Sequence, residues 1–110
     1  MLEIVNTRQT MQTGLSGRSF MKENQGMLFD FGSQKQTPAF WMKDMKFNLD
    51  LIWISDDKII GITSNVPAPI NNKNLPTYFP PSPVNQVLEV SAGWVGRNKI
   101  QIGDKIKLSN

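Results

Sequence analysis

The segment DLIWIS-DD-KIIGITSN, residues 50–65, decides the fold of this chain. Two runs rich in β-branched and apolar residues flank Asp56-Asp57, whose side chains suit a tight turn. The pattern predicts an antiparallel hairpin in which residues 50–55 pair with residues 58–65. In the first run Leu51 and Trp53 alternate with Ile52 and Ile54, so both faces of the hairpin are expected to be covered.

Shorter patterns on either side of the hairpin predict further strands. They cover residues 2–6, 26–31, 38–43 and 84–90, and a closing segment where Ile100, Ile102, Ile106 and Leu108 alternate around Gly103-Asp104. The start of the chain, Met1-Leu2-Glu3-Ile4-Val5, predicts a strand rather than a signal peptide.

Two short helices are expected between these strands. Thr7 can cap a helix over residues 8–13 with Gly14 as its left-handed stop, and Ser91 can cap a second helical turn that ends at Asn98. The sum predicts a mainly-β fold in a single domain, residues 1–110. The expected architecture is a β-sandwich or partly open β-barrel of six or seven short strands with two short helices.

A long proline-rich connection, residues 65–83, holds six of the seven prolines. Proline has no N–H to donate to a neighbouring strand, so this segment cannot be a central strand. We expect a strap over the sheet, with at least one of Tyr78 and Phe79 packed against it. Its tip, residues 71–74, should be exposed and mobile.

The absence of two residue types restricts the chemistry. The chain contains no Cys and no His. Disulfides, zinc sites built on thiolate or imidazole, and Ser-His-Asp or Cys-His mechanisms are therefore excluded. No metal or cofactor site is expected, and any chemistry falls to carboxylates, cationic side chains, hydroxyls and one Tyr.

The charge pattern argues against a nucleic-acid partner. The net charge is +3 and the pI about 9.4, but the Lys residues are scattered and form no basic block. No apolar run approaches the roughly 18 residues of a transmembrane segment.

An ordered set of short blocks resembles domain-of-unknown-function family 192 along essentially the whole chain. The blocks are Gly14-Leu15-Ser16-Gly17-Arg18, Gly26-Met27-Leu28-Phe29-Asp30-Phe31, Phe40-Trp41-Met42-Lys43-Asp44, Leu49-Asp50-Leu51, Val66-Pro67, the Tyr78 region, Val87-Leu88-Glu89-Val90, Ala92-Gly93-Trp94 and Ile102-Gly103-Asp104. The resemblance implies a compact β-fold, often in exported or lipoprotein-like proteins, with no agreed biochemical function.

Two positions depart from the family pattern. Members often carry Cys in the proline-rich loop, where this chain has Pro69 and Asn71, and often have Asn where this chain has Asp44. A role that depends on a loop thiol is therefore not expected here.

Four charged residues lie in or beside apolar blocks and form a candidate polar cluster: Arg18, Lys43, Asp50 and Glu89. Buried carboxylates need cationic or N–H partners, and Arg18 is the natural bidentate one. The cluster predicts a buried ion-pair network that fixes a loop against the sheet. The alternative is a polar pocket in which Asp50 and Glu89 act as acid and base or hold ligand hydroxyls.

A candidate binding groove is expected between the strap and residues 40–44. Trp41, Asp44, Tyr78 and Phe79 would supply its stacking and polar groups. The alternative is a plain lid that seals the core.

These observations favour a non-catalytic accessory module that binds a small polar ligand, a carbohydrate or a protein. Two alternatives remain: a carboxylate-dependent hydrolase acting on a carbohydrate, and a single-strand nucleic-acid binder.

Overall fold

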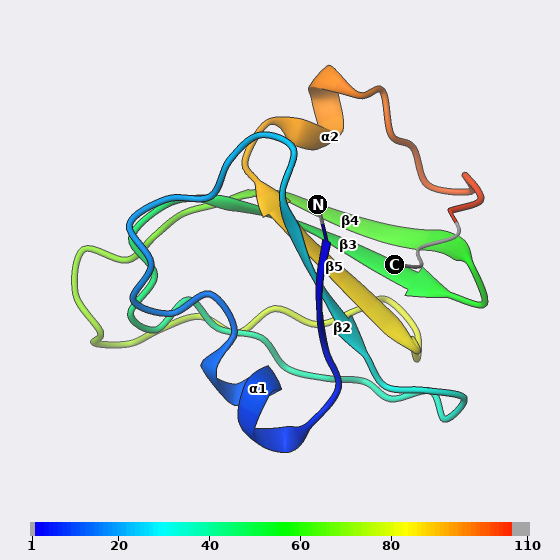
Figure 1. The fold of residues 1–110 in the computed structure, drawn as a ribbon, viewed down its shortest axis with the longest axis horizontal. Helices are drawn as coiled ribbons and strands as arrows, with labels where there is room; N and C mark the ends of the chain where they lie inside the picture. Colours follow the sequence, from blue (N-terminus) through cyan, green and yellow to red (C-terminus); the bar gives the residue numbers. More distant parts are fainter. Residues whose placement is uncertain (1, 107–110) are drawn as a thin grey trace.

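The computed structural model describes residues 2–106, which form one open five-stranded sheet with two short helices (Figure 1). The elements are β1 (Leu2–Val5), α1 (Arg8–Thr13), β2 (Gly26–Asp30), β3 (Leu49–Ser55), β4 (Lys58–Val66), β5 (Gln86–Ser91) and α2 (Trp94–Arg97). The strand order is β1-β2-β5-β3-β4. β1 runs parallel to β2 and the other neighbours are antiparallel.

The predicted hairpin is confirmed. β3 pairs antiparallel with β4 across Asp56-Asp57, whose φ angles are 50° and 62°. Two consecutive positive φ angles define the turn that matches the twist of paired strands, and aspartate tolerates them better than most residues.

The sheet has two apolar faces because side chains alternate along each strand. The loop-covered face carries Met27, Phe29, Leu51, Trp53 and Val87, which belong to one core cluster. The α2 face carries Leu28, Ile52, Ile54, Leu88 and Val90, which pack with Val95 of α2 in a second cluster.

α1 covers part of the loop-covered face, where Met11 packs against the core. The helix begins as predicted at Thr7, whose hydroxyl accepts the backbone N–H of Thr10 at 3.1 Å in a capping box. It ends at Gly14, whose φ of 49° and ψ of −130° lie outside the left-handed helical region that was expected.

The proline-rich strap lies over the same face. Tyr78 packs against the core as predicted, whereas Phe79 is exposed. The tip, residues 71–74, is exposed as expected. Gly61 makes the close approach possible, because a Cβ there would lie 2.9 Å from Cδ of Pro81.

The expected β-sandwich or partly open β-barrel of six or seven strands is not confirmed, since residues 2–106 form one open sheet of five strands. Within residues 38–43 only Phe40 pairs, in an isolated bridge with Tyr78 of the strap, because a proline-rich partner offers few N–H groups. The closing segment forms an isolated bridge between Lys105 and Lys58 and backbone hydrogen bonds to Ile59 and Asp57, but no regular strand within residues 100–106. Leu108 lies outside the described residues.

Candidate functional site

The four charged residues of the expected cluster do not come together. Arg18 forms a bidentate pair with Glu3 of β1, with Nη2 2.8 Å from Oε2, instead of reaching Asp50 or Glu89. This hydrogen bond lowers the pKa of Glu3. Lys43 is exposed and lies over the ring of Trp41, 5.5 Å from its centroid. The prediction that these four residues form an ion-pair network between loop and sheet is therefore wrong.

The Arg18–Glu3 pair is exposed, with side-chain exposures of 41% and 46%. We expect Arg18→Ala to lower the free energy of unfolding by less than about 1 kcal/mol, the usual limit for surface pairs. Urea denaturation of Arg18→Ala and Glu3→Gln tests this. A loss above about 2 kcal/mol for either variant would contradict the exposed pairing and restore the buried-network interpretation.

Asp50 is buried on the α2 face, where its carboxylate accepts hydrogen bonds from backbone N–H groups of two other segments. Its Oδ1 accepts the N–H of Asn65 at 2.8 Å, and its Oδ2 accepts the N–H groups of Gly93 and Val95 at 3.0 and 3.1 Å. The side chain expected to cap α2, Ser91, instead donates to the carbonyl of Met21. Asp50 thus fixes the end of β4 and the start of α2 on β3, which is a structural role.

Asp50 and Glu89 lie on opposite faces of the sheet. Asp50 is opposite Val90 in the β3–β5 register, while Glu89 is opposite Leu51. Neighbouring strand positions point to opposite faces, so the two carboxyl groups are separated by the sheet itself. They cannot act together as acid and base on one substrate.

Glu89 is the buried charged residue on the loop-covered face, which also carries the exposed Glu3 opposite Met27. It lies on the central strand β5 between Met27 of β2 and Leu51 of β3, and is 6% exposed. No hydrogen bond or ion pair joins its carboxyl group to another residue in the described part of the chain. Burial disfavours the charged form and raises the pKa of Glu89 to about 8.

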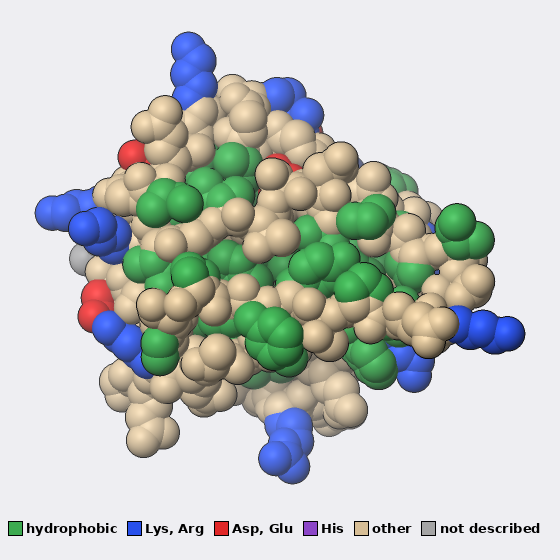
Figure 2. All heavy atoms as spheres, turned by 180° about the vertical axis from the view of Figure 1, so that it is seen from behind, with side chains coloured by type: hydrophobic (Ala, Val, Ile, Leu, Met, Phe, Trp, Pro, Cys, Tyr) green, Lys and Arg blue, Asp and Glu red, His purple; other side chains and the backbone are tan. Residues whose placement is uncertain are grey.

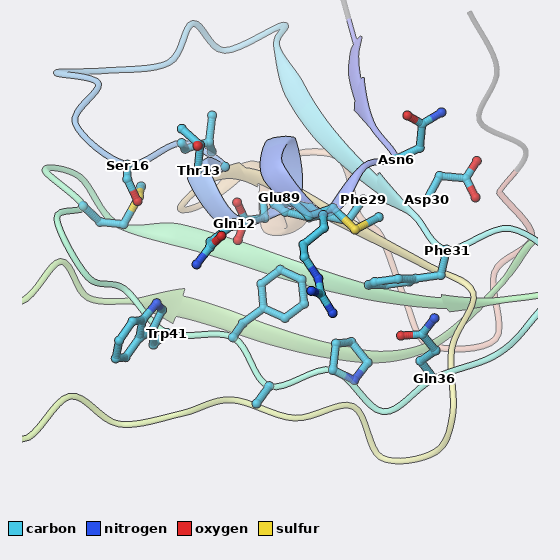
Figure 3. A pocket seen from close by; sticks show the side chains of 18 of the residues that line it. Asn6, Gln12, Thr13, Ser16, Phe29, Asp30, Phe31, Gln36, Trp41 and Glu89 are labelled. Atoms are coloured by element: carbon cyan, nitrogen blue, oxygen red, sulfur yellow. The ribbon is translucent and has the colours of Figure 1, made fainter.

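Glu89 lines a cavity of about 1110 Å³ (Figure 3). The walls come from α1 and the loop after it, from β2 and the loop after it, and from residues 38–41. The main lining side chains are Met11, Gln12, Leu15, Phe29, Phe31, Gln36, Phe40 and Trp41. The volume is slightly above the usual range for small-molecule sites. The walls combine these aromatic and aliphatic side chains with polar ones, which also include Asn6, Arg8, Thr13, Ser16 and Asp30.

The expected groove residues are dispersed. Trp41 is 54% exposed and lines the cavity, but Tyr78 bonds back to Phe40 through two backbone hydrogen bonds of 2.9 and 2.7 Å. These bonds join the strap to the Phe40 segment where a groove had been expected. Phe79 is 57% exposed and lines neither of the two described cavities.

Asp44 does not line the same cavity as Trp41. Its φ is 61°, and its carboxylate accepts from the amide of Asn72 at 2.8 Å, which holds the tip of the strap. It lines a smaller cavity of about 490 Å³ with Ile70 and Lys46. The hydrogen bond between Asn72 and Asp44 fixes the tip of the strap to the loop that carries Asp44.

Sequence reasoning missed the contribution of α1 to the site. Gln12 and Thr13 line the cavity, although a short helix with a polar sequence gives no local sign of a binding role. Phe31 was the detectable signal, since it continues the apolar alternation of β2 beyond the last paired residue.

Residues 2–106 contain no group of three or more acidic side chains placed to hold a metal ion. In the same part of the chain, neither helix has the length and apolarity needed to cross a membrane.

The chain matches a known protein family. The model of the family DUF192, described as Uncharacterized ACR, matches residues 1–108. No curated protein matches the chain.

Two crystal structures are similar. A protein of unknown function from Novosphingobium aromaticivorans is 26% identical with a TM-score of 0.85, over 97% of this chain and 74% of that one. A candidate transcription regulator from Sinorhizobium meliloti is 33% identical with a TM-score of 0.81, over 94% of this chain and 78% of that one.

Proposed function

The chain belongs to the DUF192 family, which has no established biochemical function, and we propose that it is a non-catalytic module that binds a small ligand in the cavity above Glu89. The observation that carries this proposal is the unpaired carboxyl group of Glu89. A largely buried carboxyl group without a protein partner is costly unless water or a ligand satisfies it, and Glu89 opens into the cavity, where either can reach it.

The architecture supports a binding role. The sheet provides a rigid floor, while α1, residues 38–41 and the strap form a covering layer of loops. We propose that this layer stands in for the second sheet of a sandwich and leaves the space that a second sheet would fill. Sites held by a rigid scaffold and lined by loops are a common arrangement for ligand binding.

The two alternatives draw less support. A carbohydrate hydrolase would need two cooperating carboxyl groups, and the expected pair is divided between the faces of the sheet. The name of the Sinorhizobium relative would suggest a nucleic-acid function. On the face shown in Figure 2, however, Lys and Arg side chains project around the margin, and the middle is a band of hydrophobic side chains. Nucleic-acid binders concentrate basic groups in one stripe or groove.

An occlusion experiment tests the proposal. We expect a fragment library screened by amide NMR shifts to perturb the residues around the cavity, such as Gln12, Phe31 and Phe40. Ala39→Trp should abolish these perturbations, because Ala39 is exposed, lines the cavity and can be enlarged without repacking the core.

Ser19→Trp is the matched control, since Ser19 is exposed and outside both described cavities. It should bind the same fragments as wild type. Fragment shifts confined to the α2 face, or binding that survives Ala39→Trp, would overturn the proposal.

A further inference from the structure

The cavity that Glu89 lines also has aromatic rings in its walls. Phe29, Phe31, Phe40 and Trp41 all line it. Phe29 and Phe40 meet edge to face, with centroids 5.0 Å apart and an interplanar angle of 82°. Ring faces carry negative electrostatic potential, so rings and a carboxylate favour the same kind of ligand group, a cation.

The other charged groups near Glu89 do not reverse this preference for a cationic ligand group. The other charged lining residues are Arg8 of α1 and Asp30 of β2. Arg8 is exposed, so water screens its charge, and the Asp30 carboxylate accepts the N–H of Gly32 at 2.9 Å. The strand neighbours of Glu89 are the uncharged Met27 and Leu51, and residues 38–41 add no charged side chain. Beyond Met27 on the same face, Glu3 is paired with Arg18, so that pair adds no net charge.

No described residue partners the Glu89 carboxyl group, which opens into the cavity, so its partner there is water or a ligand. A neutral hydrogen-bond acceptor would satisfy only the protonated acid. A cation would satisfy the carboxylate, and charge-assisted hydrogen bonds are roughly twice as strong as neutral ones.

We propose that the cavity takes a ligand with a primary amine on an apolar or aromatic body, and that its ammonium group pairs with the Glu89 carboxylate. This inference rests on the proposed binding function. The ring-lined walls hold the body of the ligand, and the carboxylate fixes the position and charge of its head group.

A measurable consequence is proton release. Free Glu89 keeps its proton up to a pH of about 8, and the amine complex requires the ionised carboxylate. Below that pH each binding event displaces about one proton, so the affinity should rise about tenfold per pH unit towards pH 8 and level off above it.

Three probes on one scaffold test the inference: phenylbutylamine, phenylbutanol and phenylbutanoate. We expect the amine to bind wild type at least tenfold more tightly than the alcohol or the acid at pH 8. Calorimetry in buffers of different ionisation heat should show release of about one proton near pH 7 for the amine only.

Variants separate this inference from the general binding function. Glu89→Gln should weaken amine binding at least tenfold and remove its pH slope, while phenylbutanol binding is kept. Glu23→Gln, a surface change at the pair with Arg97, should behave as wild type.

Two outcomes would overturn the amine ligand and leave the binding function standing. One is equal binding of amine and alcohol with no pH slope, and the other is tighter binding of the acid. If none of the probes shifts a cavity resonance at millimolar concentration, the amine inference fails, and the fragment screen then decides the binding function separately.

Discussion

Replacing Glu89 with glutamine is expected to make the protein more stable than wild type at alkaline pH. The carboxyl group is ionised in the unfolded chain above about pH 4.5, whereas burial raises the pKa of Glu89 to about 8 in the folded protein. The folded state thus binds the proton more tightly, and wild-type stability falls as pH rises between these values. The full loss, on the order of 5 kcal/mol at about 1.4 kcal/mol per tenfold change in proton affinity, is reached above pH 8.

Glutamine has a similar shape and cannot ionise, so the variant escapes this loss. Below about pH 4.5 both proteins carry a neutral group at this position, and their stabilities should converge. Urea denaturation from pH 4 to pH 9 measures the difference, with Glu23→Gln as the matched surface control. A Glu89→Gln variant that is less stable than wild type at every pH would mean that the carboxylate is already stabilised in the folded protein.

Replacing Asp50 with alanine should have a large effect of the opposite sign. The change removes the acceptor of three backbone N–H groups, from Asn65, Gly93 and Val95, in a site where Asp50 itself is 1% exposed. An unsatisfied buried donor costs about 1–3 kcal/mol, so we expect a loss of roughly 3–5 kcal/mol in the free energy of unfolding.

Asp50→Asn is the graded comparison. Asparagine keeps one acceptor oxygen but turns an amide donor towards N–H groups, so it should lose part of the stability that alanine loses. Amide exchange should show which part fails first, namely the start of α2 or the end of β4. An alanine variant within about 1 kcal/mol of wild type would show that water replaces the carboxylate at little cost.

The local elements of the fold could be read from the sequence. The β3–β4 hairpin and α1 depend on neighbouring residues: paired aspartates that tolerate positive φ, and a threonine three residues before another hydroxyl. The strand count failed because pairing depends on a distant partner. Residues 38–43 have strand-like side chains, but the partner that the fold brings to them is the proline-rich strap.

The candidate site was predicted only in part, for a similar reason. Asp50 and Glu89 both stand in apolar strands, and both were correctly expected to be buried. Whether they share a face depends on the register of β5 against β3, which joins segments more than thirty residues apart. The cavity itself draws on α1, β2, β5 and residues 38–41, so no single stretch of sequence reveals it.

Titration of the Glu89 carboxyl carbon by NMR in the ligand-free protein tests most directly whether this carboxyl group is buried and unpaired. Labelled glutamate gives one resonance for each Glu, and Glu89→Gln identifies the relevant one. We expect the pKa of Glu89 to be about 8, because burial disfavours the charged form and no described residue partners the carboxyl group. An ordinary pKa near 4.5 would show that the carboxylate is solvated or paired, and would contradict the claim that Glu89 is buried without a partner in the ligand-free protein.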